Sequence, residues 1–442
     1  MNTAPSPPAR PNVLVFFTDQ QRWDTTGVHG NPLGLTPAFD RLAERGVLVE
    51  NSFTNQPVCA PSRASLQTGM YPTTTGVHRN GVPLDPETPT LARHFAAAGY
   101  DTGYIGKWHL AGDDYAGAVP EADRAGYRHW LAANLLEFTS DAYETTLYDD
   151  DGRPHEFDGY RADALGAAAI DYIRRERDNP FFLFLSFLEP HHQNSRDDYP
   201  APTGYAERYE GADGWVPDDL AALDGNWPEH LGGYYGMVRR LDEVLENIVD
   251  ALDRRGVLDN TIILFTSDHG CHFKTRNDEY KRSCHDASLR VPTLLTGPGF
   301  DAGVRLPDLV GHVDLPPTLL DAAGLEVPDV MQGRSLLPLL RGGDPERPDD
   351  VLVQVSESEV GRALRTPRWK YGVTAPDADP HHAPGSDRYV DTYLYDLDAD
   401  PHELTNLVDD PAYADVRAAL RDRLADRIEE SGERRPVIVE AA

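Results

Sequence analysis

The sequence contains few cysteines: Cys59, Cys271 and Cys284 are the three in 442 residues. So small a number excludes a disulfide framework for a chain of this length. Cys271 and Cys284 flank a polar loop, and we expect both to be free thiols. The apolar run Phe181–Leu188 is far too short to span a bilayer. Residues 1–11 are rich in proline and lack the apolar stretch of a signal peptide, so we expect a cytoplasmic protein without a membrane partner.

Basic residues are also scarce. The chain has 41 Lys and Arg against 73 Asp and Glu, which gives a formal net charge of −32. A nucleic-acid partner is therefore not expected, because such proteins usually carry the opposite charge. An anionic substrate would be repelled at long range, so a site for one must gather cations locally.

Short apolar runs alternate with helical patterns through the first two thirds of the chain. This order predicts an α/β fold with a doubly wound, largely parallel sheet that helices cover on both faces. Gly46, Gly99 and Gly256 lie where three of the helices should stop. The expected strands are Val13–Phe17, Tyr100–Ile105, Phe181–Phe187, Thr261–Phe265 and Val291–Leu295, and the expected helices are Thr36–Arg45, Thr90–Ala98, Ala162–Arg177 and Met237–Arg255.

The segment Leu339–Asp350 is rich in glycine, proline and charge, which is typical of a boundary between two structural units. We therefore divide the chain into a catalytic domain, residues 1–342, and a smaller α+β subdomain, residues 343–442. The subdomain should hold a small antiparallel sheet and one packed helix. Residues 111–160 and 193–230 are long and polar, and we expect them to form loops around a substrate entrance.

The run Cys59-Ala60-Pro61-Ser62-Arg63 is the most informative segment of the sequence. Pro61 suits the first helical position, Ser62 can cap free amides, and Gly69 is a natural helix stop. A nucleophile at a helix start faces free N–H groups and the positive end of the helix dipole, which attract anions. Arg63 adds a forked cation suited to tetrahedral oxyanions. The alternative interpretation is a buried structural cysteine.

Polar residues also follow several of the expected strands. Asp19 and Gln20 follow the first strand, and Asp268 and His269 follow the strand Thr261–Phe265. Ligands of open α/β sheets bind beyond the carboxyl ends of the strands, so these four side chains could converge on a divalent cation. Each aspartate alone could equally be a turn or helix cap. Lys107 and His109 follow another strand at a spacing that points both to one side, which suits an anion.

Taken together, these segments resemble the sulfatase family, which belongs to the alkaline phosphatase superfamily. The resemblance rests on the cysteine run, on Gly106-Lys107-Trp108-His109, on Pro190-His191, on the stretch from Lys281 to Pro292 and on the tail from Tyr393 to Leu407. It implies an alkaline-phosphatase-like fold and conversion of Cys59 to formylglycine. It also implies a catalytic set and a metal set: Cys59, Arg63, Lys107, His109, His191 and Lys281 for catalysis, and Asp19, Gln20, Cys59, Asp268 and His269 for one divalent ion.

The family's usual metal is calcium, with manganese or magnesium in some relatives. Gln20 stands where an aspartate is commoner, which makes it the least secure of the ligands. The implied activity is hydrolysis of a sulfate ester, with a sulfated saccharide as the candidate substrate, after a maturation enzyme has generated the formylglycine. Hydrolysis of phosphonate monoesters or phosphodiesters is the alternative, since the same residues accept phosphorus oxyanions. A non-catalytic relative that binds sulfated ligands is a further alternative.

Overall fold

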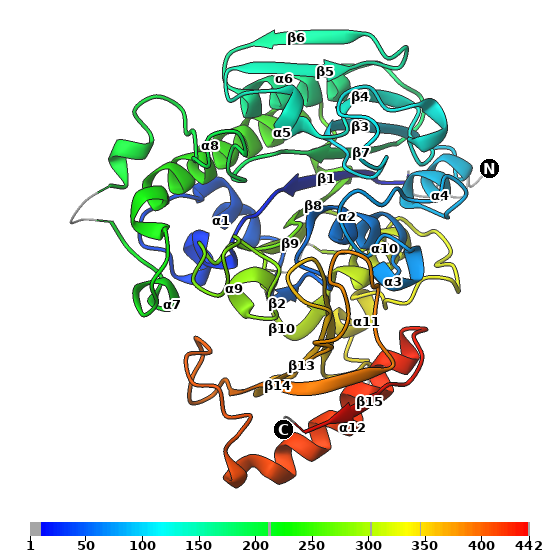
Figure 1. Ribbon diagram of the computed structural model, residues 1–442. Helices are drawn as coiled ribbons and strands as arrows, with labels where there is room; N and C mark the ends of the chain where they lie inside the picture. The colour runs from blue at the N-terminus through cyan, green and yellow to red at the C-terminus, as the bar shows by residue number, and fades with distance from the viewer. Residues whose placement is uncertain (1–9, 211–213, 301–302, 345, 441–442) are drawn as a thin grey trace.

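A computed structural model of the protein describes residues 10–210, 214–300, 303–344 and 346–440. Its main feature is a ten-stranded mixed sheet that fills the larger part of the molecule (Figure 1). In spatial order the strands are β10 (Val304–Gly311), β2 (Val47–Phe53), β9 (Thr293–Thr296), β8 (Thr261–Ser267), β1 (Asn12–Thr18), β7 (Phe181–Ser186), β3 (Asp101–Lys107), β4 (His129–Ala133), β5 (Glu144–Tyr148) and β6 (Pro154–Asp158).

The centre of this sheet is parallel. Strands β8, β1, β7, β3 and β4 all run in one direction, whereas β9, β5 and β6 pair antiparallel with their neighbours. Side chains alternate between two cores: Val13, Val15 and Phe17 face one, and Leu14 and Phe16 face the other. The prediction of a largely parallel α/β fold is confirmed.

Helices cover both faces of the sheet. The first core is closed by α2 (Cys59–Thr68), α4 (Leu91–Ala97) and α10 (Leu315–Ala322), and the second by α1 (Pro37–Ala43), α6 (Arg161–Arg174) and α8 (Trp227–Arg254). The shorter helices are α3 (Pro72–Thr75), α5 (Leu136–Thr139), α7 (Asp218–Ala221), α9 (Asp286–Leu289) and α11 (Leu337–Leu340). No helix among the described residues is both long enough and apolar enough to cross a membrane.

Two expectations from the sequence were wrong. Residues 111–160, expected as loops, contain strands β4 to β6 and helix α5. Helix α8 starts at Trp227 rather than at Met237, so it takes up the end of the second expected loop region. Glycines in the first turns of α8 disfavour helix, so the sequence pattern did not indicate a helix there. They are required there, because a Cβ on Gly233 would lie 2.3 Å from the carbonyl oxygen of Tyr199 and one on Gly236 would lie 2.7 Å from Ala201 Cβ.

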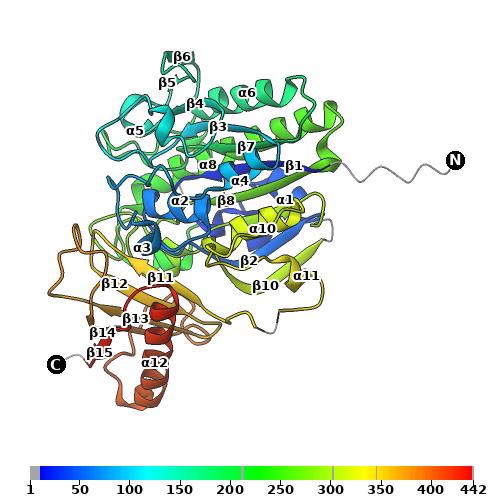
Figure 2. The same ribbon diagram turned by 90° about the vertical axis from the view of Figure 1, so that its right-hand side faces the viewer.

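A second, smaller sheet lies beside the large one, with helix α12 (Ala414–Glu430) packed on it (Figure 2). Its strands pair antiparallel apart from the last two, which are parallel. Leu420, Leu424 and Ile428 of α12 pack on one face of this sheet. The predicted smaller α+β unit is thus confirmed. The strands in order are β11 (Val351–Val355), β12 (Gly361–Arg365), β13 (Trp369–Thr374), β14 (Arg388–Asp396) and β15 (Val437–Val439).

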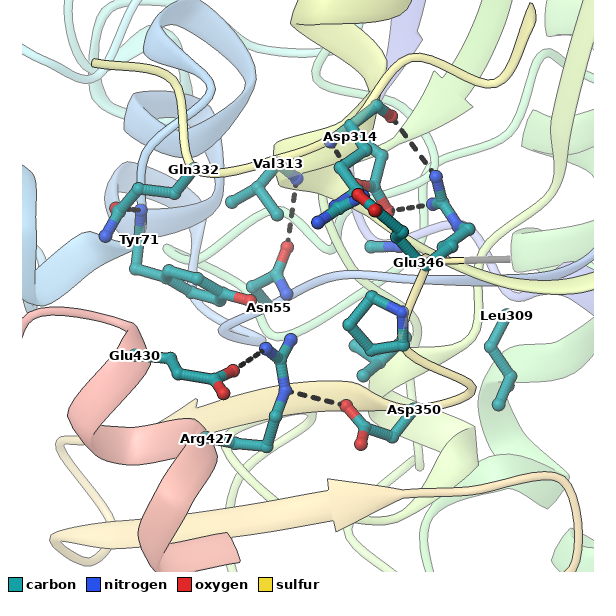
Figure 3. Close-up of a pocket in the computed structure, with 15 residues that line it drawn as sticks. Asn55, Tyr71, Leu309, Val313, Asp314, Gln332, Glu346, Asp350, Arg427 and Glu430 are labelled. Carbon is teal, nitrogen blue, oxygen red and sulfur yellow. Dashed lines mark hydrogen bonds and ion pairs between the residues drawn. The ribbon is translucent and has the colours of Figure 1, made fainter. Parts of the chain in front are cut away.

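Two features mark the junction between the sheets. One is a cavity of about 340 Å³, bordered by Tyr71 and by Arg427, whose guanidinium pairs with Asp350 and Glu430 (Figure 3). The other is a buried ion cluster, here called the junction cluster, in which the ammonium of Lys370 contacts the carboxylates of Asp286 and Glu403. Glu403 also accepts a hydrogen bond from the Asp286 amide at 2.7 Å. The junction cluster thus ties α9 of the larger unit to the smaller sheet and its tail.

Candidate active site

The site is built where the parallel strands end. Strands β1 and β8 are neighbours in register, with Thr18 opposite Ser267, so the next residues, Asp19 and Asp268, emerge at the same edge. The chain turns sharply after Asp19, because Gln20 adopts a φ of 67°. This conformation lets the Gln20 amide donate to Asp268 Oδ1 at 2.9 Å. The two aspartates are therefore fixed relative to each other by the backbone.

Cys59 begins helix α2, which ends at Gly69 in the left-handed conformation, as expected. Two details of the predicted helix start were wrong. Pro61 lies in the third helical position, and the Ser62 hydroxyl donates to the carbonyl oxygen of Asp268 at 2.6 Å instead of capping an amide. The side chain of Asn80 serves the helix start, since its Oδ1 accepts from the Ala60 amide at 3.0 Å. Ser62 and Asn80 thus hold the nucleophile position from two sides.

A buried group of potential metal ligands surrounds Cys59. One ligand atom from each of Asp19, Cys59, Asp268 and His269 lies within 4.8 Å of the others. The side chain of Gln20 donates to the Tyr199 hydroxyl at 2.9 Å, which leaves its oxygen Oε1 buried and without a partner among the described residues. Carboxylates, an imidazole and a spare amide oxygen form a donor set that fits a divalent cation.

The charges of the two carboxylates support the same fit. Burial and Cys59 would raise the pKa of Asp19, but Lys107, His191 and Arg63 lower it well below its usual range. Burial and the charge of Asp19 raise the pKa of Asp268 to about 6. Two buried carboxylates in one place repel each other unless cations accompany them; Arg63 supplies one positive charge, and a bound metal ion would add a second.

Arg63 contacts this carboxylate pair directly. Its Nη2 lies 2.8 Å from Asp19 Oδ2 and 3.1 Å from Asp268 Oδ2. Its Nη1 donates to the Lys107 carbonyl at 3.0 Å and to the Ser186 hydroxyl at 2.8 Å. Both ends of the guanidinium fork are therefore engaged with protein atoms, and Arg63 braces the carboxylates that face the metal position.

Two ammonium groups approach the nucleophile. Lys281 Nζ lies 2.9 Å from Cys59 Sγ, and Lys107 Nζ lies 3.8 Å from it. Burial would raise the pKa of the Cys59 thiol, but Lys107 and Lys281, with hydrogen bonds to His109 and His191, lower it well below its usual range. The Nε2 atom of His191 also lies 3.2 Å from Lys281 Nζ. The environment of Cys59 therefore stabilises negative charge, as an anion site inside an acidic protein requires.

One further site residue, Glu137 on α5, could not be identified from the sequence. Its Oε1 lies 3.0 Å from Lys107 Nζ and 3.9 Å from His109 Nδ1. Its other oxygen, Oε2, is buried without a hydrogen-bond partner among the described residues. Burial would raise the pKa of Glu137, but Lys107, His109 and His191 lower it. It lies in a segment expected to be loop, with no neighbouring residue to mark it.

The structure thus brings the predicted site residues into one buried cluster at the strand ends. A cysteine held at a helix start, next to metal-type ligands and two lysines, defines a hydrolase for esters of tetrahedral oxyanions. A family model described as Sulfatase matches residues 11–325. A second model, described as the C-terminal part of N-sulphoglucosamine sulphohydrolase, matches residues 278–430. The chain belongs to the sulfatase family and is a sulfuric ester hydrolase.

Individual relatives agree with this assignment. An "Ulvan-active sulfatase" of Formosa agariphila is 31% identical over 96% of this chain and 82% of its own length. A solved structure from Bacteroides fragilis, described as a sulfatase, superposes with a TM-score of 0.83 at 25% identity and covers 98% of both chains. The phosphonate monoester hydrolase of Agrobacterium radiobacter has a TM-score of 0.72 at 27% identity, over 95% of this chain and 96% of that one.

Proposed function

We propose that the protein hydrolyses the sulfate ester of a saccharide, with a formylglycine made from Cys59 and one divalent metal ion, most favourably calcium. The observation that carries this proposal is the position of Cys59 Sγ, 2.9 Å from Lys281 Nζ and 3.5 Å from His269 Nε2. Residue 59 therefore contacts both a member of the metal-type ligand set and an ammonium group that has no carboxylate partner among the described residues. The saccharide part draws on a relative from Bacteroides thetaiotaomicron that is named "N-acetylglucosamine-6-O-sulfatase".

The residues that would hold the metal are Asp19, Gln20, Asp268 and His269, together with the modified residue 59. A bound divalent ion supplies positive charge to the oxyanion and to the nucleophilic oxygen. A formylglycine supplies a hydrated aldehyde, whose second hydroxyl allows sulfate to be released after the first has attacked sulfur. Oxygen ligands dominate the set, which favours calcium over softer ions.

The remaining side chains have roles that follow from their positions. Lys281 and Lys107 flank residue 59, so we assign them to neutralising the oxygens of the sulfate as charge shifts in the transition state. His191, whose Nε2 lies 3.2 Å from Lys281 Nζ, would hold or protonate the departing alcohol oxygen, and acid assistance there is typically worth about 10²–10⁴-fold. His109 is our candidate for the base that assists release of sulfate. Arg63 keeps the carboxylates in place, and any direct contact with the anion would involve its unpaired Nε.

Hydrolysis of phosphonate monoesters or phosphodiesters is the second candidate. The specific observation in its favour is the similarity over nearly the full chain to the phosphonate monoester hydrolase. The test is turnover of nitrophenyl sulfate, nitrophenyl phosphate, a bis-nitrophenyl diester and a nitrophenyl phosphonate by one preparation, produced together with a formylglycine-generating enzyme. We expect the sulfate to be turned over fastest. A preference of more than about tenfold for a phosphorus ester, which is about 1.4 kcal/mol in the transition state, would reverse the assignment.

Mass spectrometry of the peptide that contains Cys59 tests the modification itself. Conversion removes one sulfur and two hydrogens and adds one oxygen. An unmodified thiol in protein from the native host, without any esterase activity, would instead support a binder of sulfated ligands. The domain division at residues 1–342 and 343–442, the maturation enzyme and the cytoplasmic location stay predictions. Limited proteolysis, co-expression and cell fractionation respectively test them.

A further inference from the structure

A short turn of the smaller sheet reaches into the catalytic domain. The turn, residues 356–358, follows strand β11. The Ser356 hydroxyl accepts from Gln56 Nε2 at 2.6 Å, and the Ser358 hydroxyl donates to the Arg282 carbonyl at 2.6 Å. The turn therefore bridges the segment that precedes helix α2 and the loop that carries Lys281.

Glu357, at the centre of this turn, is bound on both oxygens. Its Oε1 accepts from the Asn80 amide at 2.7 Å, and its Oε2 accepts from Arg282 Nε at 2.9 Å and from Nη2 at 2.6 Å. Both residues have positive φ values, 66° for Glu357 and 63° for Arg282, which non-glycine residues adopt at a cost. Such backbone strain clusters at ligand sites, and here it occurs on both members of one ion pair.

This ion pair borders the nucleophile position. The backbone amide of Asn80 donates to Glu357. The side-chain oxygen of Asn80 accepts from the backbone amide of Ala60, one residue after Cys59. Arg282 directly follows Lys281, whose ammonium contacts Cys59 Sγ. The pair is therefore attached to two of the segments that hold Cys59 and Lys281, next to which the sulfate would bind.

Spare hydrogen-bonding capacity distinguishes this pair from a purely structural brace. The side chains of Arg282 and Glu357 retain 15% and 11% of their exposure. In the pair of Arg362 and Glu433 inside the smaller unit the side chains retain 1% and 14%, so the two pairs differ in the exposure of the arginine and not of the carboxylate. A guanidinium has five N–H donors, and a carboxylate accepts about four hydrogen bonds, so both groups keep sites free after their protein contacts.

We propose that Glu357 and Arg282 form a polar subsite that binds neighbouring hydroxyl groups on the alcohol part of the substrate. A carboxylate that accepts from one hydroxyl and a guanidinium that donates to the next suit a sugar ring, whereas a nitrophenyl ring offers neither. The subsite rests on the proposed function, and it names Glu357 and Arg282 as the residues that select a saccharide ester over an aryl ester. It also gives the smaller unit a direct part in substrate choice.

The test compares two substrate types on Glu357→Gln and Arg282→Gln. The saccharide probes are monosulfated glucose, galactose and N-acetylglucosamine, and the reference is nitrophenyl sulfate. We expect kcat/KM for the best saccharide sulfate to fall on the order of ten- to a hundredfold in both variants, as for loss of a charged hydrogen bond. The value for nitrophenyl sulfate should change much less. Glu279→Gln is the matched control, because Glu279 binds Arg282 Nη1 from the exposed side.

A second measurement does not depend on how well the variants fold. Deoxy analogues of the best saccharide sulfate, each lacking one hydroxyl beside the ester, should react more slowly with the unaltered protein. That penalty should disappear in Glu357→Gln for one of the analogues. Equal losses on both substrate types, or a penalty that persists in Glu357→Gln for every deoxy analogue, would overturn the subsite. Turnover of nitrophenyl sulfate with no saccharide sulfate accepted would also overturn it, but would leave the sulfatase assignment intact. Failure on every sulfate would instead remove the proposed function.

Discussion

Two buried lysines show how similar burial serves opposite purposes in this protein. Lys370, in the junction cluster, retains 0% of its side-chain exposure and contacts the carboxylates of Asp286 and Glu403. Lys281, in the active site, is 4% exposed, yet within the described residues no carboxylate lies within ion-pair distance of its ammonium. Its neighbours are instead Cys59 Sγ at 2.9 Å, His269 Nε2 at 3.0 Å and His191 Nε2 at 3.2 Å.

The difference teaches which buried charge is structural and which is functional. A charge removed from water is costly unless a partner of opposite sign accompanies it. Lys370 has two such partners inside the protein, so its charge is compensated whether or not a ligand is present. Lys281 lacks a carboxylate of its own, and an anionic substrate would complete its environment. The four predictions below test this distinction.

The largest effect is expected from breaking the compensated cluster. Lys370→Met leaves the buried carboxylate of Glu403 without its cation and leaves Asp286 with Arg365 alone, so the free energy of unfolding should fall by about 3–5 kcal/mol. Chemical denaturation measures the change, and activity per folded molecule should be largely retained. Adding Asp286→Asn and Glu403→Gln to Lys370→Met should recover most of the stability. Unchanged stability in the single variant would contradict the structural role of Lys370.

Replacing Lys281, which has no carboxylate partner among the described residues, should lower activity without lowering stability. Lys281→Ala deletes a cation that acts in the transition state, so kcat/KM for nitrophenyl sulfate should fall by about 10²–10³-fold. The free energy of unfolding should stay the same or rise, since no buried carboxylate loses its partner. Lys274→Ala is a useful control, because Lys274 pairs with Asp197 at the surface. A Lys281→Ala variant that unfolds but keeps its turnover would reverse the comparison.

Chelation should affect the proposed metal ligands of the active site and leave the junction cluster unchanged. If the metal is present at about a hundred times its dissociation constant, its removal should lower the free energy of unfolding by about 2.7 kcal/mol. Thermal melting with and without a chelator measures this loss. Asp268→Asn should abolish the response to the chelator, whereas Asp286→Asn should preserve it. A response that survives Asp268→Asn would place the metal elsewhere.

A third arrangement is a buried carboxylate bound mainly by amides, and its effect on stability should depend on pH. Asp242 of α8 accepts from the Ala38 and Phe39 amides at 2.9 Å each, at the start of helix α1. Burial raises its pKa to about 7. Because the folded pKa exceeds the unfolded one, the contribution of Asp242 to stability is full below about pH 4 and is lost as the pH rises to about 7, by at most about 4 kcal/mol. Asp242→Asn should flatten this part of the pH–stability curve, and an unchanged curve would contradict it.

Much of the site could be predicted from the sequence because its parts follow buried strands. Asp19, Lys107 and Asp268 each come at or just after an apolar run, and parallel pairing brings such positions to one edge of the sheet. Glu137 could not be found this way. It lies on a four-residue helix between short strands of mixed polarity, where neither periodicity nor spacing marks a buried position.

The limits of the fold prediction have similar physical causes. Strand β10 contains Pro307 and a register shift between Leu306 and Leu309, features that an edge strand tolerates but that hide it in the sequence. Strand β6 is mostly exposed, so it lacks an apolar run. Contacts such as that between Glu357 and Arg282 join residues 75 positions apart, and no local pattern signals them.

The burial of residue 59 sets the order of events by which the protein becomes active. Cys59 is 1% exposed, so no other macromolecule can reach its sulfur once the chain has folded. The turn at residues 356–358, which helps to close the pocket, is synthesised some 300 positions later. An enzyme that alters residue 59 must therefore act on the nascent or unfolded chain. If residue 59 is modified as proposed, the active fraction of the population would depend on the rate of that modification relative to folding, and a slower-folding variant would be expected to emerge more completely matured.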